Sequence, residues 1–235
     1  MLINIIGSNN TAQDKFLIIV AFMISAMFAI TFHEVSHGYV AKLNGDDTAK
    51  MMGRLTFNPV KHFDLLGFLM FIVVGFGWAK PVPINPNNFK NYKKGVITVS
   101  LAGVFANLIA CFVNFGLLAC MMAIAANTAI DSAVGMVFYK FFTFLFLYGT
   151  IINISLIAFN ILPIYPLDGF NVLAMLTKPN NKAVAFLRQY GYGILIILLL
   201  VGTIFPAFDF IGMYFGAVQN AILGLFSKLF GGIII

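Results

Sequence analysis

The chain has 235 residues, of which 61% are hydrophobic and only 9% are charged. Soluble domains carry about 25% charged residues, so this composition excludes an ordinary soluble domain and predicts an integral protein of the lipid bilayer. The net charge of +6 does not indicate nucleic-acid binding, because the cations fall in the gaps between apolar segments, as they do in membrane loops.

The first long apolar segment, residues 16–37, ends in the motif His33-Glu34-x-x-His37. Glu34 is the single glutamate of the chain. Ionisable groups in an apolar helix are costly and indicate function by default. Two histidines at i and i+4 share one helix face and can bind one metal ion, and the glutamate can act as general base toward a metal-bound water. The alternative is that both histidines only form hydrogen bonds to neighbouring helices.

The next apolar stretch, residues 63–79, has basic residues on both flanks. A full membrane span would place one of these basic clusters outside, against the positive-inside tendency. Irregular backbone is tolerated at membrane depth where protein surrounds it. We therefore expect a re-entrant or short β-hairpin element near residues 63–84, with a full span as the alternative.

The rest of the chain holds three clear apolar segments and a weaker fourth: 95–130, 137–161, 189–208 and 210–227. We expect an all-α multi-pass membrane protein, a helical bundle of about 4–6 membrane segments. No repeat or linker divides the sequence, so residues 1–235 are expected to form a single domain. Its core is residues 15–180, and residues 189–235 are accessory membrane segments.

Charge also predicts the orientation of the chain in the cell membrane. Lys and Arg concentrate in residues 42–61, 80–94 and 178–188, which are expected on the cytoplasmic side. The segment 127–132 contains neither residue type and is expected outside, as is the N-terminus. This topology places the histidine–glutamate motif toward the cytoplasmic end of its helix, at the same depth as Asp168.

A catalytic zinc ion usually has three protein ligands, so a third must come from elsewhere in the chain. The candidates are His62, Asp64, Asp131, Asp168 and Asp209. Asp168 is favoured because Pro163, Pro166 and Gly169 break the helix around it and allow close backbone approach. The alternative role for Asp168 is the N-cap of a helix that begins near Phe170. His62 and Asp64 are expected in a solvated loop, and the other two on the far side.

Three motifs occur in order along residues 15–180. They are His33-Glu34-x-x-His37, Gly77-Trp78-Ala79-Lys80-Pro81-Val82-Pro83-Ile84 and Asn160-x-x-Pro163-x-x-x-x-Asp168-Gly169. Together they resemble the site-2 protease family (peptidase family M50) of intramembrane zinc metalloproteases. The chain is most similar to the compact bacterial members that lack a PDZ or CBS domain.

The resemblance implies one zinc ion per chain, bound by His33, His37 and Asp168, with Glu34 as the catalytic base. It also implies that Asn160 holds substrate or stabilises the oxyanion. Asn107 is a further candidate for that role, although the family proline ahead of it is missing in this chain. Helix packing is an equal alternative for Asn107, and Phe170 stands where many members have a second glycine.

The implied function is hydrolysis of peptide bonds in a transmembrane protein or peptide, that is, regulated intramembrane proteolysis. One alternative is a proteolytically inactive homologue that binds membrane proteins, but every metal and base position is filled here. Another alternative is a metal transporter. Transporters usually spread polar groups along a path, whereas this chain gathers them at one depth.

Overall fold

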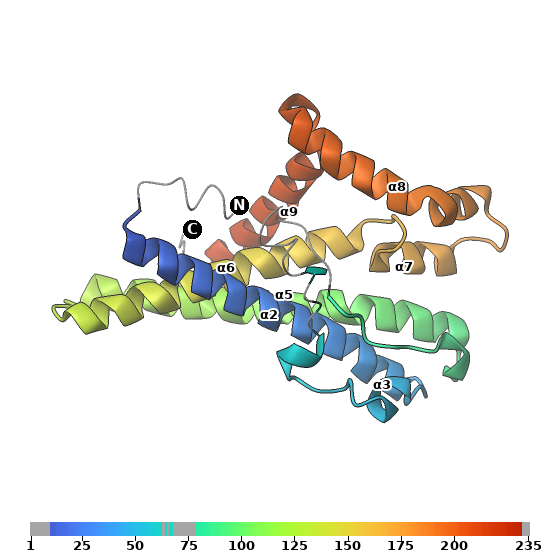
Figure 1. Cartoon of the computed structure of the whole chain (residues 1–235), viewed down its shortest axis with the longest axis horizontal. Coiled ribbons are helices and arrows are strands. Elements are labelled where there is room, and N and C mark those ends of the chain that lie inside the picture. Colours follow the sequence, from blue (N-terminus) through green and yellow to red (C-terminus); the bar gives the residue numbers. More distant parts are fainter. Residues whose placement is uncertain (1–9, 63, 65, 68–78, 232–235) are drawn as a thin grey trace.

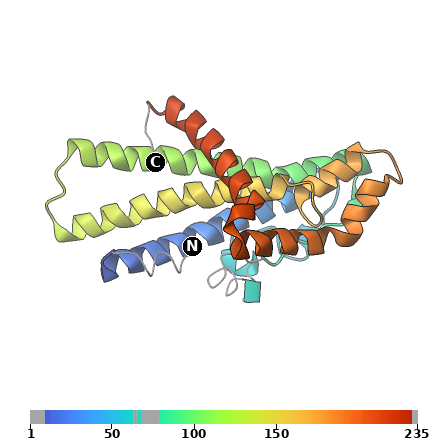
Figure 2. The same ribbon diagram turned by 90° about the horizontal axis from the view of Figure 1, so that it is seen from above.

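Three long apolar helices form the body of the molecule. They are α2 (Ala12–Leu43), α5 (Tyr92–Asn127) and α6 (Ala133–Ile161), and each packs against the other two (Figures 1 and 2). The computed structural model describes residues 10–62, 64, 66–67 and 79–231. With a rise of about 1.5 Å per residue, each of these helices is longer than the ~30 Å hydrocarbon core of a bilayer.

Two further helices, α8 (Lys182–Ile204) and α9 (Phe210–Leu229), bring the candidate membrane spans in the described residues to five. The shorter described elements are α3 (Thr48–Met51), α7 (Asp168–Leu176) and the 3-10 turns η1 (Pro59–His62), η2 (Pro86–Asn88) and η3 (Pro206–Phe208). The prediction of an all-α multi-pass membrane protein with about 4–6 membrane segments is confirmed.

Polar caps explain why two helices begin earlier than hydropathy predicts. The Thr11 side chain accepts the N–H of Asp14 at 3.1 Å, and the Asn91 side chain accepts the N–H of Lys94 at 2.9 Å. Such caps satisfy backbone donors that the first helical turn leaves unpaired. Helix α2 therefore begins at Ala12 rather than at residue 16, and α5 begins before residue 95.

The two C-terminal helices extend away from the three-helix body (Figure 1). Helix α9 is joined to the body by an aromatic cluster in which Phe226 packs with Cys111, Phe115 and Ile154. Helix α8 packs mainly against α9 and η3, and its many exposed apolar side chains suit contact with lipid.

A buried carboxylate ties the chain that follows α2 to the chain that precedes α5. Asp46 is 0% exposed, and its Oδ2 accepts the backbone N–H of Asn85 at 2.7 Å. Its Oδ1 accepts the Asn88 side-chain amide at 2.7 Å and the backbone N–H of Thr48 at 3.1 Å. Because a buried carboxylate needs several donors, this knot fixes residues 80–90 against the end of α2.

The re-entrant or β-hairpin element expected near residues 63–84 falls mostly on residues 63, 65 and 68–78, which lie outside the described residues. Its last part, residues 79–84, is described and contains no regular helix or strand. Residues that precede proline are restricted to extended conformations, which applies to Lys80 and Val82.

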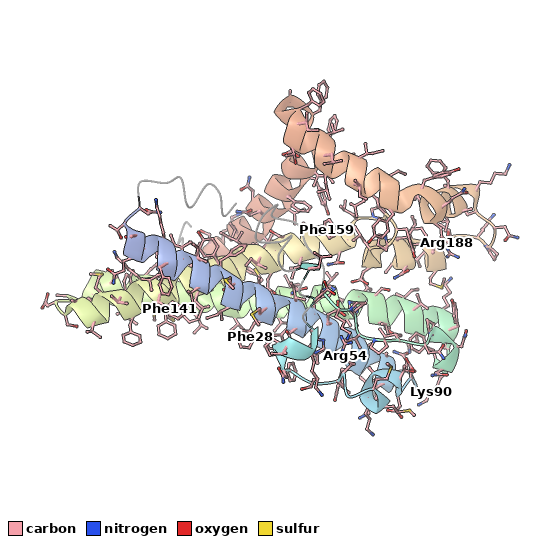
Figure 3. All side chains as sticks on the ribbon, in the orientation of Figure 1. Phe28, Arg54, Lys90, Phe141, Phe159 and Arg188 are labelled. Atoms are coloured by element: carbon pink, nitrogen blue, oxygen red, sulfur yellow. The ribbon has the colours of Figure 1, made fainter. Side chains whose placement is uncertain are left out.

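Positively charged side chains gather toward one end of the molecule. Figure 3 shows Arg54, Lys90 and Arg188 toward the end opposite Phe141.

The Asp46 knot predicts a pH-dependent loss of stability. Burial raises the pKa of Asp46, but hydrogen bonds from Thr48, Asn85 and Asn88 outweigh it and hold the pKa below its ordinary value of 3.8. A carboxyl with a lowered folded-state pKa contributes stability above pH 3.8, and this is lost as the pH falls through the folded value. We expect Asp46→Asn to reduce the free energy of unfolding at pH 7 by about 1–3 kcal/mol.

Thermal unfolding of the detergent-solubilised protein measures this difference, which should shrink as the pH falls below about 4. The matched control is Asp47→Asn, because Asp47 is exposed and makes no side-chain capping bond to α3. Equal stability of the Asp46→Asn and Asp47→Asn variants at pH 7 would contradict the role given to the knot.

Candidate metal centre

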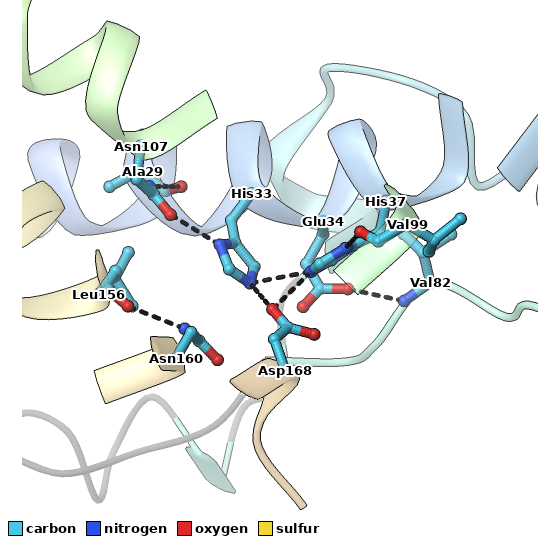
Figure 4. Close-up of polar contacts among 10 residues, drawn as sticks. All are labelled: Ala29, His33, Glu34, His37, Val82, Val99, Asn107, Leu156, Asn160 and Asp168. Carbon is cyan, nitrogen blue, oxygen red and sulfur yellow. Dashed lines mark hydrogen bonds and ion pairs between the residues drawn. The ribbon is translucent and has the colours of Figure 1, made fainter. Parts of the chain in front are cut away.

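Three side chains from two helices converge at one point in the body of the molecule. His33 and His37 lie one turn apart on α2, and Asp168 is the first residue of α7 (Figure 4). The Oδ2 atom of Asp168 is 3.3 Å from Nε2 of His33 and 3.2 Å from Nε2 of His37. The two Nε2 atoms are 2.9 Å apart. Both histidines are buried, so these three atoms face one another away from bulk solvent.

The far side of each imidazole ring is held by a hydrogen-bond acceptor. Nδ1 of His37 is 2.7 Å from the carbonyl oxygen of Val99 on α5. A carbonyl only accepts hydrogen bonds, so Nδ1 of His37 carries a proton, and in the neutral ring Nε2 then presents a lone pair. Nδ1 of His33 is 2.6 Å from Oδ1 of Asn107 and is held in the same tautomer.

The orientation of the Asn107 amide follows from its other partners. Its Nδ2 donates to the carbonyl oxygen of Ala29 at 3.2 Å and to Oδ1 of Asn153 at 2.7 Å. The Asn153 amide is oriented in turn, because its Nδ2 donates to the Gly149 carbonyl at 2.7 Å. Oδ1 of Asn107 therefore faces His33, whose Nδ1 must donate, and in the neutral ring Nε2 of His33 again presents a lone pair.

With both rings neutral, this arrangement brings three acceptor atoms together with no donor between them. Oδ2 of Asp168 is buried and has no hydrogen-bond partner in the described part of the chain. Converging lone pairs and a buried negative charge are unfavourable unless a cation lies among them. Two imidazole nitrogens and one carboxylate oxygen form a donor set typical of catalytic zinc, and the acceptors behind both rings fix their orientation as metal sites require. The residues therefore fit a zinc ion.

The close approach of the helices depends on two glycines. A Cβ atom at Gly103 of α5 would overlap the ring of His33, and one at Gly169 of α7 would overlap the carbonyl of Ile161 at the end of α6. Helices can only come this close where a residue has no side chain. Phe170, which replaces the second glycine of many family members, is 1% exposed and packs edge-on against Tyr165.

Glu34 lies beside this centre on α2 (Figure 4). Its Oε2 accepts the backbone N–H of Val82 at 2.8 Å. The carboxylate is thus next to the proposed ligands but is held by a different segment of the chain. A carboxylate beside the ligand cluster but outside it fits a general base, which must act on a metal-bound water without being a ligand.

The two asparagines predicted to contact substrate have different surroundings. Asn160, in the last turn of α6, donates its amide to the Leu156 carbonyl at 3.0 Å and lies on the Asp168 side of the centre (Figure 4). Its role toward substrate stays a prediction. Asn107 is 0% exposed and lies behind His33 with both ends of its amide bonded. These contacts give Asn107 a role in orienting His33, and its predicted role toward substrate or the oxyanion stays a prediction.

The other candidate ligands do not join the cluster, which among the described residues consists of His33, His37 and Asp168. The sequence predicts a solvated loop position for His62, and this is wrong. His62 is 1% exposed, and its Nε2 is 2.8 Å from the Thr56 carbonyl. The N-cap of α7 is Leu167, so Asp168 does not have the capping role that was its alternative.

Sequence reasoning missed Asn153 and the backbone N–H of Val82. Asn153 stands within a predicted apolar span, and a polar side chain in such a span is a signal that it has a specific partner. No comparable signal exists for Val82, because its contribution comes from its main chain.

Comparison with known proteins agrees with this geometry. The model of peptidase family M50 matches residues 21–200. The chain belongs to peptidase family M50. It is 37% identical over 208 residues to a Bacillus subtilis protein described as "Putative zinc metalloprotease YwhC", covering 88% of this chain and 91% of that protein. No solved structure matches the chain.

A further relative is the Mycolicibacterium smegmatis protein described as "Putative zinc metalloprotease Rip2". It is 27% identical over 180 residues, which cover 74% of this chain and 64% of that protein. The family and these relatives make zinc the cofactor of the chain, and His33, His37 and Asp168 are the residues that fit it.

Replacing Asp168 tests the third ligand. We expect Asp168→Ala to weaken zinc binding by at least about 100-fold, because loss of a ligand costs at least as much as loss of an orienting partner. Zinc content of the purified protein, measured by mass spectrometry of the metal, should fall to near zero. Asp131→Ala is the control, since Asp131 is exposed and outside the cluster. Parental zinc content in Asp168→Ala would exclude it as a ligand.

Gly103→Ala tests the close approach of α5 to His33. The new methyl group would overlap the imidazole ring, and overpacking of this kind costs about 1–3 kcal/mol. We expect weaker zinc binding in competition with a chelator and a lower unfolding temperature. The matched control is Gly193→Ala in α8, where an added Cβ meets no atom within 4 Å. Similar zinc affinities for the two variants would show that Gly103 is not needed for the site.

Proposed function

We propose that this M50 member is an intramembrane zinc metalloprotease that hydrolyses peptide bonds of transmembrane substrates. The observation that carries the proposal is the position of Glu34. It flanks a three-ligand zinc site formed by a candidate membrane-spanning helix and by α7, which follows another such helix. Metal binding alone does not need a carboxylate in this position, whereas hydrolysis needs one as the general base.

The chemistry that zinc supplies when bound is Lewis-acid activation of a water molecule and of the substrate carbonyl. Glu34 accepts a proton from the attacking water and returns it to the amine of the leaving peptide. The Val82 N–H holds Oε2 of Glu34 and so limits rotation of the carboxylate during this transfer. Asn160 is the candidate donor to the oxyanion that develops on the scissile carbonyl.

The membrane location restricts the substrate to chains that can unwind. An intact helix keeps its peptide carbonyls in internal hydrogen bonds, so the scissile segment must be extended when it reaches Glu34. Transmembrane segments with helix-breaking residues meet this requirement at the lowest cost.

We also propose that the centre lies toward the cytoplasmic side of the cell membrane and that the N-terminus is outside. The labelled cations Arg54, Lys90 and Arg188 lie toward the end of the molecule where α2 carries His37 (Figure 3). Lys and Arg near the ends of membrane segments favour the cytoplasmic side.

Glu34→Gln tests the proposed function. The variant keeps the shape of the side chain and all three ligands, so we expect parental zinc content. Loss of the base should reduce cleavage by about 10²–10⁴-fold. The assay uses proteoliposomes that contain the full chain and a single-span test protein with Gly and Pro in its transmembrane segment, and it follows the products by gel electrophoresis.

Three outcomes separate the candidate functions. Undiminished cleavage by Glu34→Gln would rule out Glu34 as the base. A zinc-loaded parent that binds the test protein without cleaving it would indicate the inactive homologue. Zinc uptake into the same vesicles, retained in Glu34→Gln, would indicate a transporter.

A further inference from the structure

Residues 80–85, here called the strap, form an extended segment beside Glu34. Pro81 and Pro83 have no backbone N–H, which removes two of the donors in this short stretch. Four donors remain, and three of them have described hydrogen bonds, all to other segments; the N–H of Ile84 has none among the described contacts. The three pairs are Lys80 N–H to the His62 carbonyl at 3.0 Å, Val82 N–H to Glu34 at 2.8 Å and Asn85 N–H to Asp46 at 2.7 Å.

The strap packs closely against α2 at a position where α2 has no side chain. The side chain of Val82 is 6% exposed and faces Gly38, one helical turn after Glu34. A Cβ atom at Gly38 would lie 2.9 Å from Cγ1 of Val82 and 3.2 Å from Cβ of Ala49. Glu34 and Gly38 share one face of the helix, so the N–H and the side chain of Val82 contact adjacent positions on it.

Arg54 holds the strap immediately before Val82. Its Nη2 donates to the carbonyl oxygen of Lys80 at 2.7 Å and to that of Pro81 at 3.2 Å. A guanidinium is always charged, and hydrogen bonds from a charged donor are about twice as strong as neutral ones. The Asp46 knot holds the other end at Asn85. Val82 therefore lies between two anchors, and no hydrogen bond joins Arg54 to Glu34 among the described contacts.

We propose that Arg54 is a positioning residue for Glu34, which it orients through the strap and the N–H of Val82. This inference rests on the proposed function, in which Glu34 is the base. One fixed oxygen sets the direction of the carboxylate toward the zinc ligands. Release of the Lys80 and Pro81 carbonyls lets the strap move off α2 and leaves Glu34 without its partner. The zinc ligands have separate supports in Val99 and Asn107, so metal binding is unaffected.

The test compares Arg54→Ala, Arg54→Lys and Lys61→Ala in the proteoliposome assay. Lys61→Ala is the matched control, because Nζ of Lys61 also donates to a loop carbonyl, that of Gly53 at 3.0 Å, but does not contact the strap. We expect Arg54→Ala to lower kcat by about 10- to 100-fold, the cost of misplacing a catalytic group by about 1 Å. KM and zinc content should stay at parental values.

Arg54→Lys should recover most of kcat, because an ammonium group can donate to the same carbonyls. Lys61→Ala should keep parental kcat. A loss of kcat in Lys61→Ala equal to that in Arg54→Ala, or loss of zinc from Arg54→Ala, would show that Arg54 only stabilises the loop and would overturn the inference.

Hydrogen exchange gives a readout that does not depend on activity. The Val82 amide is flanked by two prolines, so peptides that cover the strap contain few exchangeable positions. Exchange at Val82 should be faster in Arg54→Ala and in Glu34→Ala, and unchanged in Lys61→Ala. Parental protection of Val82 in Arg54→Ala would overturn the inference.

A size-complementation pair keeps the inference testable if Arg54→Ala does not fold. Gly38→Ala should push Val82 away from α2 and lower kcat with zinc retained. Adding Val82→Ala removes the branched methyl groups at the point of overlap and should restore part of kcat. Failure of the second change to restore activity would contradict positioning through the strap.

These results separate failure of the inference from failure of the proposed function. Loss of cleavage in Glu34→Gln with parental kcat in Arg54→Ala overturns the inference alone. Full cleavage in Glu34→Gln overturns the role of Glu34 as the base and with it the catalytic meaning of the strap, whatever the exchange data show. Absence of cleavage by the zinc-loaded parent overturns the proposed function itself.

Discussion

Three acceptor atoms meet at the centre of the molecule, and the surrounding structure is arranged to hold them there. Hydrogen bonds from Nδ1 of His33 and His37 leave both Nε2 lone pairs facing the buried oxygen of Asp168. This convergence is repulsive unless a metal ion or a proton lies among the three atoms, so the packing of α2, α5 and α7 holds together groups that need a cation. Metal binding is thereby linked to the stability of the assembled helices, since the ligands come from separate elements.

The supports of this centre come from polar groups placed on apolar helices. Asn107 and Asn153 extend a hydrogen-bond chain from His33 across α5 to α6. Every amide in the chain has a partner, which is the condition under which polar groups are tolerated in an apolar interior. Glycine at position 103 lets α5 approach the imidazole, so one helix supplies both the space and the support.

The sequence predicts the residues of the metal site better than it predicts the groups that hold those residues in place. Spacing alone brings His33, Glu34 and His37 to one end of a span, and helix breakers single out Asp168. Hydropathy places the spans within a few residues, and the differences arise from caps such as Thr11. The role of Asn107 and the contribution of the Val82 N–H could not be predicted, because both depend on which segments meet in space. The expected element near residues 63–84 lies largely outside the described part of the chain.

The prolines of the strap also affect whether its backbone can form hydrogen bonds with an extended substrate. A substrate that has lost its helix exposes a row of unpaired backbone groups, and any nearby strand edge can pair with it. In the strap, Pro81 and Pro83 have no N–H, and the N–H groups of Lys80, Val82 and Asn85 are already bonded to the protein itself. The segment that holds Glu34 therefore offers few donors to a passing chain, and any pairing with that chain must rely mainly on carbonyl oxygens of the strap.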